Sequence, residues 1–302
     1  MFSIGVDIGG SHISCGIYDH LNKLLLKKTV VHRKVNTMAS KDAILESWFS
    51  AILETIKSAE LPIVGIGIAM PGPFDYSKGI SYIAEVDKLN SLYGVNLRLE
   101  LSSRLGFSPS KIRFINDASA FSIAEALTGK ALGYSRVVAI TLGTGFGSSF
   151  LVDAQPIVQA VNVPKGGFLY NHCYHGILAD DIFSTRGITS QYNVLSGKAV
   201  KNVRELSELV PQDQDAKHVF ELFGENLGEF LSPYLRKFNA EVLVIGGNIA
   251  KAYDHFRTNL GQQLPECTIY VSEFGEEAAI IGSALLLDEE FYVNLEPTLK
   301  LM

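Results

Sequence analysis

A short apolar strand that runs into two glycines constrains this chain more than any other stretch. Residues 4–11 read Ile-Gly-Val-Asp-Ile-Gly-Gly-Ser, so the strand carries Asp7 into a turn formed by Gly9 and Gly10. Adjacent glycines have no Cβ, which lets backbone N–H groups come close to a bound anion. A carboxylate there repels phosphate but can hold the hydrated Mg²⁺ of a nucleoside triphosphate. These residues alone fit a tight turn between two ordinary strands equally well.

A second glycine turn lies between two strands. The strand-like residues 137–142 are followed by Gly143, Thr144, Gly145 and Gly147, and a further strand comes after them. The segment contains no Gly-Lys-Ser/Thr and its glycines do not open a helix. It is therefore neither a Walker phosphate loop nor a Rossmann fingerprint.

A third glycine turn closes an apolar strand and leads into a helical pattern. It reads Gly246-Gly247-Asn248 after the strand 242–245. Backbone without side chains can lie flat against an adenine or a ribose there. Each turn alone is a weak signal, but three turns in this order indicate a nucleotide-binding protein.

In this order the motifs resemble those of the ROK (repressor, open reading frame, kinase) family of sugar kinases and regulators. That family belongs to the superfamily of actin-like ATPases and hexokinases, and the resemblance extends from Ile4 to about Leu287. It implies an α/β fold of two actin-like (ribonuclease H-like) lobes with an interlobe cleft. The motifs that carry it are residues 7–11, 67–73, 116–120, 141–147, 245–248 and 278–284.

The resemblance implies a kinase that uses ATP and Mg²⁺ to phosphorylate a hydroxyl of a hexose or an N-acetyl-amino sugar. Ser11 stands where the family usually has Thr, and His12 where Lys is common. Asp7 is expected to hold Mg²⁺ through water. The residues expected to bind the nucleotide are Asp7, Gly9, Gly10, Ser11, His12, Thr141, Gly143, Thr144, Gly145, Gly246, Gly247 and Asn248.

Asp117 is the candidate general base. It follows the apolar run 112–115 and precedes an Ala-rich helical pattern, so a helix N-terminus would favour its carboxylate. From the residues alone, Asn116-Asp117 also reads as an ordinary helix cap. The resemblance favours catalysis, because this pair matches the family's catalytic motif.

The sugar side departs from the family pattern. A Glu and a His of the family bind sugar ahead of a Cys-rich zinc loop, whereas this chain has no such Glu and its three cysteines lie far apart. His172 is expected to replace that His, with His175 as runner-up, and no structural zinc is expected. The residues expected to bind the sugar are Gly72, Asn116, His172 and Asp180.

Strand-like and helical segments alternate along the chain, as in an α/β protein. We expect a smaller N-terminal α/β lobe over residues 1–115 and a larger C-terminal one over 116–302. The last helix, near 278–287, is expected to pack back on the first lobe. Expected strands cover 2–8, 13–19, 23–32, 63–69, 137–142, 149–153 and 241–246, and expected helices cover 42–59, 118–128, 217–236 and a segment from 249.

The charge balance argues against one class of partner. The net charge is −6, the pI is about 5.7, and no dense run of Lys and Arg occurs, so a nucleic-acid surface is not expected. No apolar run reaches the ~18 residues that a membrane span needs. We expect a cytoplasmic homodimer that binds a small-molecule sugar, with neither nucleic acid nor membrane as a partner.

Two other functions compete with a sugar kinase. ROK repressors carry a winged helix before the first glycine turn, whereas Asp7 comes almost at once here. The missing Glu favours a catalytically weak sugar-binding or regulatory ROK protein without a DNA-binding domain. Asp7 and Asp117 favour the kinase, because a pure binder needs neither a metal carboxylate nor a base.

Overall fold

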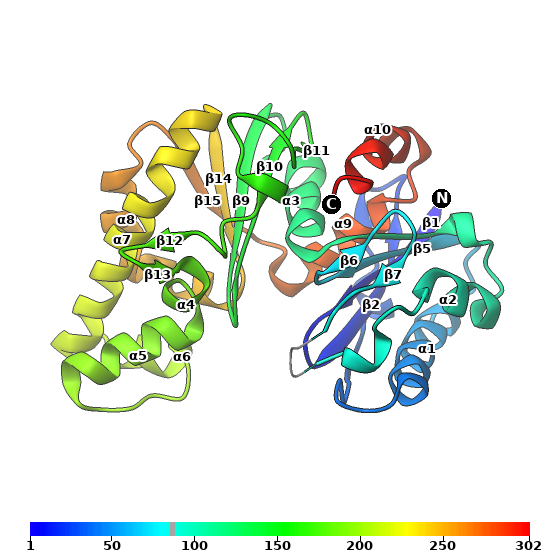
Figure 1. The fold of residues 1–302 in the computed structure, drawn as a ribbon, viewed down its shortest axis with the longest axis horizontal. Helices are drawn as coiled ribbons and strands as arrows, with labels where there is room; N and C mark the ends of the chain where they lie inside the picture. Colours follow the sequence, from blue (N-terminus) through cyan, green and yellow to red (C-terminus); the bar gives the residue numbers. More distant parts are fainter. Residues whose placement is uncertain (85–87) are drawn as a thin grey trace. The chain divides into compact units, whose positions relative to one another are not determined.

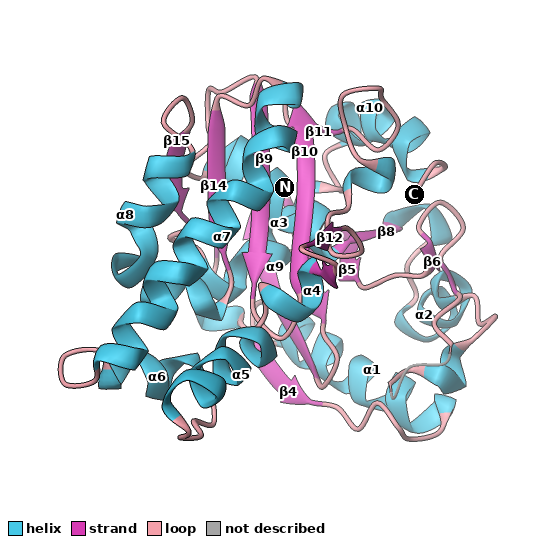
Figure 2. Cartoon of the chain, turned by 60° about the vertical axis from the view of Figure 1, so that its left-hand side comes forward, coloured by secondary structure: helices cyan, strands magenta, loops and turns pink. Residues whose placement is uncertain are grey.

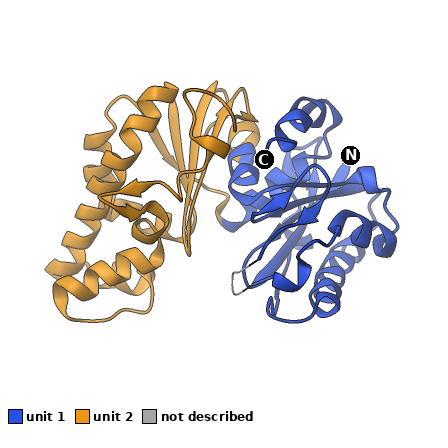
Figure 3. Cartoon of the chain, viewed as in Figure 1, with its two compact units in different colours: residues 1–124, 276–302 blue, residues 125–275 orange. Residues whose placement is uncertain are grey.

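The chain folds as two units, each built around its own sheet, in a computed structural model that describes residues 1–84 and 88–302 (Figure 1). Unit 1 comprises residues 1–124 and 276–302, and unit 2 comprises residues 125–275 (Figure 3). The two ends of the chain therefore belong to the same unit. The observed division comes later than the 115/116 boundary expected from the sequence.

Unit 1 contains a mixed sheet in the order β3-β2-β1-β5-β8, with β4 also paired to β2. β1 and β2 form an antiparallel hairpin, whereas β1, β5 and β8 run parallel. The elements of this unit are β1 (Phe2–Ile8), β2 (His12–Asp19), β3 (Leu24–Leu25), β4 (Val31–Lys34), α1 (Lys41–Lys57), β5 (Ile63–Met70), β6 (Phe74–Asp75), β7 (Ile80–Ser81), α2 (Leu97–Leu105), β8 (Ile112–Asn116), most of α3 (Asp117–Thr128), α9 (Ala278–Leu285) and α10 (Glu289–Leu299).

Helix α9 lies directly on the backbone of this sheet. A Cβ on Gly5 of β1 would lie 1.8 Å from the carbonyl oxygen of Ile280, and one on Gly67 of β5 would lie 1.7 Å from that of Ser283. The Ser283 hydroxyl also accepts a hydrogen bond from the Val6 N–H at 3.1 Å. Only glycine allows a helix to approach strands this closely.

The same helix explains why α3 starts in unit 1. A Cβ on Gly282 of α9 would lie 1.8 Å from the carbonyl oxygen of Ala120 in α3. The first part of α3 is thus packed against the returning C-terminal segment, and the division between the units moves to residue 124. Residues 116–124, assigned to the second lobe from the sequence, belong to unit 1.

The strand expected over 23–32 is interrupted. It consists of β3, a 3₁₀ turn at Lys27–Thr29, and β4. The buried Thr29 hydroxyl donates to the Leu26 carbonyl at 2.7 Å and accepts from the Ile17 N–H at 2.9 Å. These bonds fold the chain inward where an apolar pattern alone predicts continuous strand.

Unit 2 repeats the strand pairing of unit 1. Its sheet has the order β11-β10-β9-β14-β15, with β9 and β10 antiparallel and β9, β14 and β15 parallel. The elements are β9 (Arg136–Leu142), β10 (Phe146–Val152), β11 (Gln155–Pro156), β12 (Cys173–Tyr174), β13 (Ile177–Leu178), α4 (Ala179–Ile182), α5 (Thr185–Ser196), α6 (Val203–Leu209), α7 (Gln214–Phe238), β14 (Val242–Gly246), α8 (Tyr253–Gln263) and β15 (Thr268–Val271).

The core of unit 2 lies between this sheet and the long helix α7, next to α8 (Figure 2). Phe150 of β10 packs edge-on against Phe238 at the end of α7, with ring centroids 5.2 Å apart. Along α7, Gly224 lets α8 approach closely, because a Cβ there would lie 2.4 Å from the Phe256 carbonyl oxygen. Among the described residues, no helix is long and apolar enough to cross a bilayer.

The contact between α9 and the sheet predicts a large, specific loss of stability. We expect Gly67→Ala to lower the free energy of unfolding by at least about 2 kcal/mol, because overpacking against backbone cannot relax by rotamer change. Gly261→Ala in α8 is the control, since nothing lies within 4 Å of its Cβ position. It should leave stability unchanged or raise it by up to about 1 kcal/mol. Urea denaturation measures both, and equal stability of the two variants would contradict the prediction.

Candidate active site

Three parallel strands of unit 1 end at the same edge of the sheet. In the register of the sheet, Asp7 of β1 pairs with Ala69 of β5, and Met70 of β5 pairs with Asn116 of β8. Polar groups that follow these strands are therefore neighbours, although they are far apart in sequence. Ligands of open α/β sheets bind at this carboxyl edge.

The first glycine turn closes the hairpin between β1 and β2. Its Gly9 N–H donates to the His12 carbonyl at 3.0 Å. The imidazole of His12 folds back over Gly9, where an added Cβ would lie 2.4 Å from its Cε1. Its Nε2 lies 3.8 Å from Oδ2 of Asp7, an ion-pair distance rather than a hydrogen bond. The turn is a hairpin turn, as the simpler interpretation held, and it carries a charged pair.

This pair changes the protonation of His12. The Asp7 carboxylate raises the pKa of His12 above its ordinary value of 6.5, while partial burial acts in the opposite direction and Glu276 adds a further rise. The sequence left open whether His12 is neutral. Asp7 therefore favours the imidazolium form of His12 over the neutral ring.

Asp117 is the first residue of α3 and directly follows β8. Its Oδ1 accepts a hydrogen bond from the Ala118 N–H at 2.9 Å. Water reaches the side chain, yet protein atoms surround it densely enough that burial raises the pKa of Asp117, and the nearby Asp7 charge adds to the rise. A raised pKa makes a carboxylate a stronger base.

The predicted sugar residues of unit 1 gather around Tyr76. The Tyr76 hydroxyl donates to the Met70 carbonyl at 3.0 Å, and the Asn116 amide lies 3.4 Å from the same oxygen. A Cβ on Gly72 would lie 3.5 Å from it. Asn116 also caps α3, since its Oδ1 accepts from the Ser119 N–H at 3.2 Å. Sequence reasoning missed Tyr76, whose signal is its place shortly after Gly72.

Lys88 was missed as well. A methyl group placed on Gly10 would lie 3.2 Å from the Lys88 Nζ. In the sequence it is one lysine in a loop between recognised motifs, and only the fold brings it to the first glycine turn.

In unit 2, the second and third glycine turns lie side by side. Gly246 of β14 pairs with Thr141 of β9, so both turns follow the same sheet edge. Gly247 has φ 85°, and a Cβ there would lie 2.3 Å from the Leu142 carbonyl oxygen. Gly143 closes the second turn by donating to the Gly145 carbonyl at 3.0 Å. The two strands and the glycines expected from the sequence thus form one continuous backbone surface.

Asp180 is held against the second turn. Its Oδ1 accepts from the Phe146 N–H at 2.7 Å, and its Oδ2 pairs with the Arg186 guanidinium. Arg186 also donates to the Thr144 carbonyl at 3.3 Å. The observed contacts of Asp180 are therefore with the turn itself, and its sugar contact stays a prediction.

The two candidate histidines differ in their surroundings. His172 Nδ1 lies 2.9 Å from the Tyr234 hydroxyl of α7, which fixes its ring. His175 is exposed, with φ 49°, at the tip of the small hairpin β12–β13. No group of three or more His, Cys, Asp or Glu side chains that could hold a metal ion occurs in residues 1–84 and 88–302.

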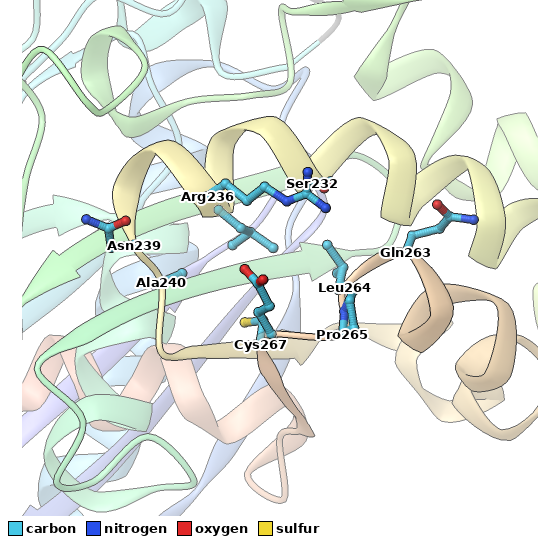
Figure 4. A pocket seen from close by; sticks show the side chains of 10 residues that line it. Ser232, Arg236, Asn239, Ala240, Gln263, Leu264, Pro265 and Cys267 are labelled. Carbon is cyan, nitrogen blue, oxygen red and sulfur yellow. The ribbon is translucent and has the colours of Figure 1, made fainter.

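Unit 2 also has a surface hollow of about 430 Å³, which does not coincide with the glycine turns (Figure 4). Ala240 and Cys267 line it, and they precede β14 and β15 respectively. The hollow therefore lies at the amino ends of these strands, whereas the second and third glycine turns follow the carboxyl ends of β9 and β14. None of the residues expected to bind sugar or nucleotide lines it.

Each unit has a sheet with the same order of strand pairing and with glycine turns at its carboxyl edge. Together these features define an actin-like α/β protein of two lobes. The chain belongs to the ROK family, whose family model matches residues 3–290.

Its relatives include named sugar kinases. A glucokinase of Thermotoga maritima is 27% identical over 95% of this chain and 97% of its own length. An N-acetyl-D-glucosamine kinase of Salmonella gallinarum is 26% identical over 93% of this chain and 98% of its own. A ROK family glucokinase of Streptomyces griseus, solved with glucose and AMPPNP, superposes with a TM-score of 0.74 at 19% identity, covering 95% of this chain and 99% of that one.

The Asp7–His12 pair predicts a measurable titration. We expect Asp7→Asn to lower the pKa of His12, because the carboxylate that stabilises the imidazolium is removed. NMR titration of the His12 ring protons measures this, and Asp42→Asn on the exposed start of α1 is the control. A His12 pKa that is the same in Asp7→Asn as in the wild type would contradict the prediction.

The same shift fixes the sign of a stability effect. Because the pKa of His12 is raised on folding, the pair's contribution is fully present below pH 6.5 and is lost as the pH rises through the folded value. The free energy of unfolding of Asp7→Asn should therefore differ less between pH 6 and pH 8 than that of the wild type.

Proposed function

We propose that this protein is a kinase that transfers a phosphoryl group from ATP to a hydroxyl of a hexose or an N-acetyl-amino sugar. The observation that carries the proposal is the shared edge of β1, β5 and β8. It brings a carboxylate at a glycine turn, a Gly-Pro loop and a second carboxylate at a helix start to one place. The named relatives, which phosphorylate glucose or N-acetyl-D-glucosamine, support the same reaction class.

Asp117 acts as the general base. Phosphoryl transfer needs one group that takes the proton from the attacking hydroxyl, and positioning and charge neutralisation supply the rest. The Ala118 N–H fixes one oxygen of Asp117 at 2.9 Å, which leaves the other oxygen for the sugar hydroxyl. The raised pKa of Asp117 increases its strength as a base.

Asp7 holds Mg²⁺ through water, and the backbone of Gly9, Gly10 and Ser11 meets the phosphates. The donor set fits, because a carboxylate oxygen suits Mg²⁺ and the glycine backbone suits an anion. When bound, Mg²⁺ supplies neutralisation of the phosphate charge. The imidazolium of His12, favoured by Asp7, adds a further positive charge to this turn.

Unit 2 supplies the remaining nucleotide contacts. Thr141, Gly143, Thr144 and Gly145 contact phosphate, and the turn 246–248 contacts the adenosine. The contacts of Gly143 and Thr144 with α5 support this assignment, because they hold the turn in one conformation. The Thr185 N–H donates to the Gly143 carbonyl at 2.8 Å, and Arg186 donates to that of Thr144.

Gly72, Asn116, His172 and Asp180 bind the sugar. The Asn116 amide supports this best, because it is placed by both Ser119 and Tyr76 and can donate and accept at once. The absence of structural zinc stays a prediction, as do the cytoplasmic location and the homodimer.

Substitution of the base tests the proposal. Asp117→Asn should lower kcat by about 10²–10⁴, because an amide cannot accept the proton. Coupled ADP release across a panel of hexoses and N-acetyl-hexosamines measures turnover, and the sugar-induced rise in melting temperature measures binding, which should survive. Asp254→Asn, exposed on α8, is the matched control.

The outcomes separate the candidate functions. A variant that keeps more than about a third of the wild-type kcat would exclude Asp117 as the base. A wild type that a sugar stabilises but that releases no ADP would instead support the catalytically weak sugar-binding protein.

The metal assignment has its own test. Asp7→Asn should raise the Mg²⁺ concentration for half-maximal activity by about 10- to 100-fold, the usual cost of losing an outer-shell metal contact. Titration of Mg²⁺ at fixed ATP measures this. An unchanged requirement would mean that the first glycine turn is only a hairpin turn.

A further inference from the structure

A lysine that belongs to no recognised motif lies against the first glycine turn. A methyl group on Gly10 would be 3.2 Å from both Cδ and Nζ of Lys88, so the end of this side chain rests on the turn's backbone. The side chain is half-buried. Within the described part of the chain, no carboxylate lies within ion-pair distance of its ammonium.

The backbone next to Lys88 is fastened to the same turn. The Leu89 N–H donates to the Thr37 carbonyl at 2.8 Å, and the Thr37 hydroxyl donates to the Gly10 carbonyl at 3.0 Å. Thr37 and Leu89 are both buried. One threonine therefore links the loop that carries Lys88 to the glycine that the lysine covers.

The conformation of Leu89 shows that this position is held firmly. Its φ of 59° lies in the left-handed region, which a leucine adopts only when the surrounding structure imposes it. The Leu89 side chain is fully buried, and its carbonyl accepts from the Leu92 N–H at 2.9 Å. The start of the Lys88 side chain is thus fixed, whereas its ammonium reaches toward the turn.

The ammonium also acts on the base. The pKa of Asp117 is raised first by burial and then by Asp7, and backbone N–H groups oppose this rise. Lys88 is the charged group that opposes it further. It therefore stands close to both the phosphate turn and the base. The group being transferred must pass between these two points, since it leaves the nucleotide and meets the hydroxyl that Asp117 deprotonates.

We propose that Lys88 binds the phosphoryl group in transfer and neutralises its charge. The end of the Lys88 side chain lies against Gly10, the second glycine of this turn. This inference rests on the proposed kinase function and adds a catalytic residue to it. A fixed cation at a transferring phosphoryl group stabilises the charge that develops there.

An acidic group on the sugar is the other anion that this ammonium can bind. The contact with Gly10 favours the phosphoryl group, because Gly10 belongs to the phosphate turn, whereas Gly72 and Asn116 gather around Tyr76. The experiment therefore compares nucleotides with and without the third phosphate, and neutral with acidic sugars.

Binding of Mg·AMPPNP and Mg·ADP tests the proposal without turnover. We expect Lys88→Met to raise the Kd of Mg·AMPPNP by about 10- to 100-fold, as for the loss of a charge-assisted hydrogen bond. The Kd of Mg·ADP should change by less than about twofold. Lys88→Arg should keep most of the preference for Mg·AMPPNP over Mg·ADP. Lys57→Met, at the exposed end of α1, is the matched control and should bind both as the wild type does. Melting temperatures establish that each variant is folded.

Turnover supplies the second readout. Lys88→Met should lower kcat on a neutral hexose by about 10²–10³, as for loss of one preorganised group at the transition state. Equal weakening of both nucleotides would overturn the proposal, and so would an unchanged preference for AMPPNP. An effect confined to the KM of an acidic sugar such as glucuronate would overturn it in favour of sugar recognition.

The two readouts distinguish failure of this inference from failure of the proposed function. If the wild type releases no ADP with any sugar but its preference for AMPPNP depends on Lys88, the kinase proposal fails and the phosphoryl contact stands. If the wild type is an active kinase and Lys88→Met matches it in both readouts, the inference on Lys88 fails alone.

Discussion

The contact of α9 with glycine backbone in the strands β1 and β5 determines the rest of unit 1. Because Gly5 and Gly67 have no side chains, carbonyl oxygens of α9 occupy the space that a Cβ would fill. In the same way, Gly282 of α9 leaves room for a carbonyl oxygen of α3. The strands β1 and β5 and the start of α3 are thereby fixed against one helix. Asp7 lies near the carboxyl end of β1, Gly72 follows β5, and Asp117 is the first residue of α3. The geometry of the candidate active site therefore follows from packing against α9.

Charge balance at the first glycine turn is the second organising feature. Burial, and after it the charge of Asp7, raises the pKa of Asp117. His12 and Lys88 place positive charge beside them. The proposed nucleotide site thus contains charged groups of both signs before any nucleotide is bound. Such preorganisation reduces the reorganisation needed when the phosphates arrive.

Local sequence was sufficient for features that depend on neighbouring residues. The three glycine turns, the strands that precede them and the placement of Asp117 between β8 and α3 follow from short apolar runs and glycine pairs. Other features depend on partners outside the local sequence. The break at Thr29 depends on its hydrogen bond with Ile17. The position of Lys88 depends on Thr37, which bonds to both Leu89 and Gly10. Asp180 shows a similar limit, because the sequence predicted it as a sugar ligand but did not reveal its contacts with Phe146 and Arg186.

The return of residues 276–302 to unit 1 has a consequence for the order of folding during synthesis. Residues 125–275 form a unit from one continuous stretch, whereas unit 1 is complete only when residues 276–302 have been made. Until α9 emerges from the ribosome, Gly5 and Gly67 border a groove in the sheet that no part of the nascent chain can yet fill. The second unit can therefore complete its fold before the first, which reverses the usual N-terminal-first order and leaves the β1–β5 surface uncovered by α9 for that interval.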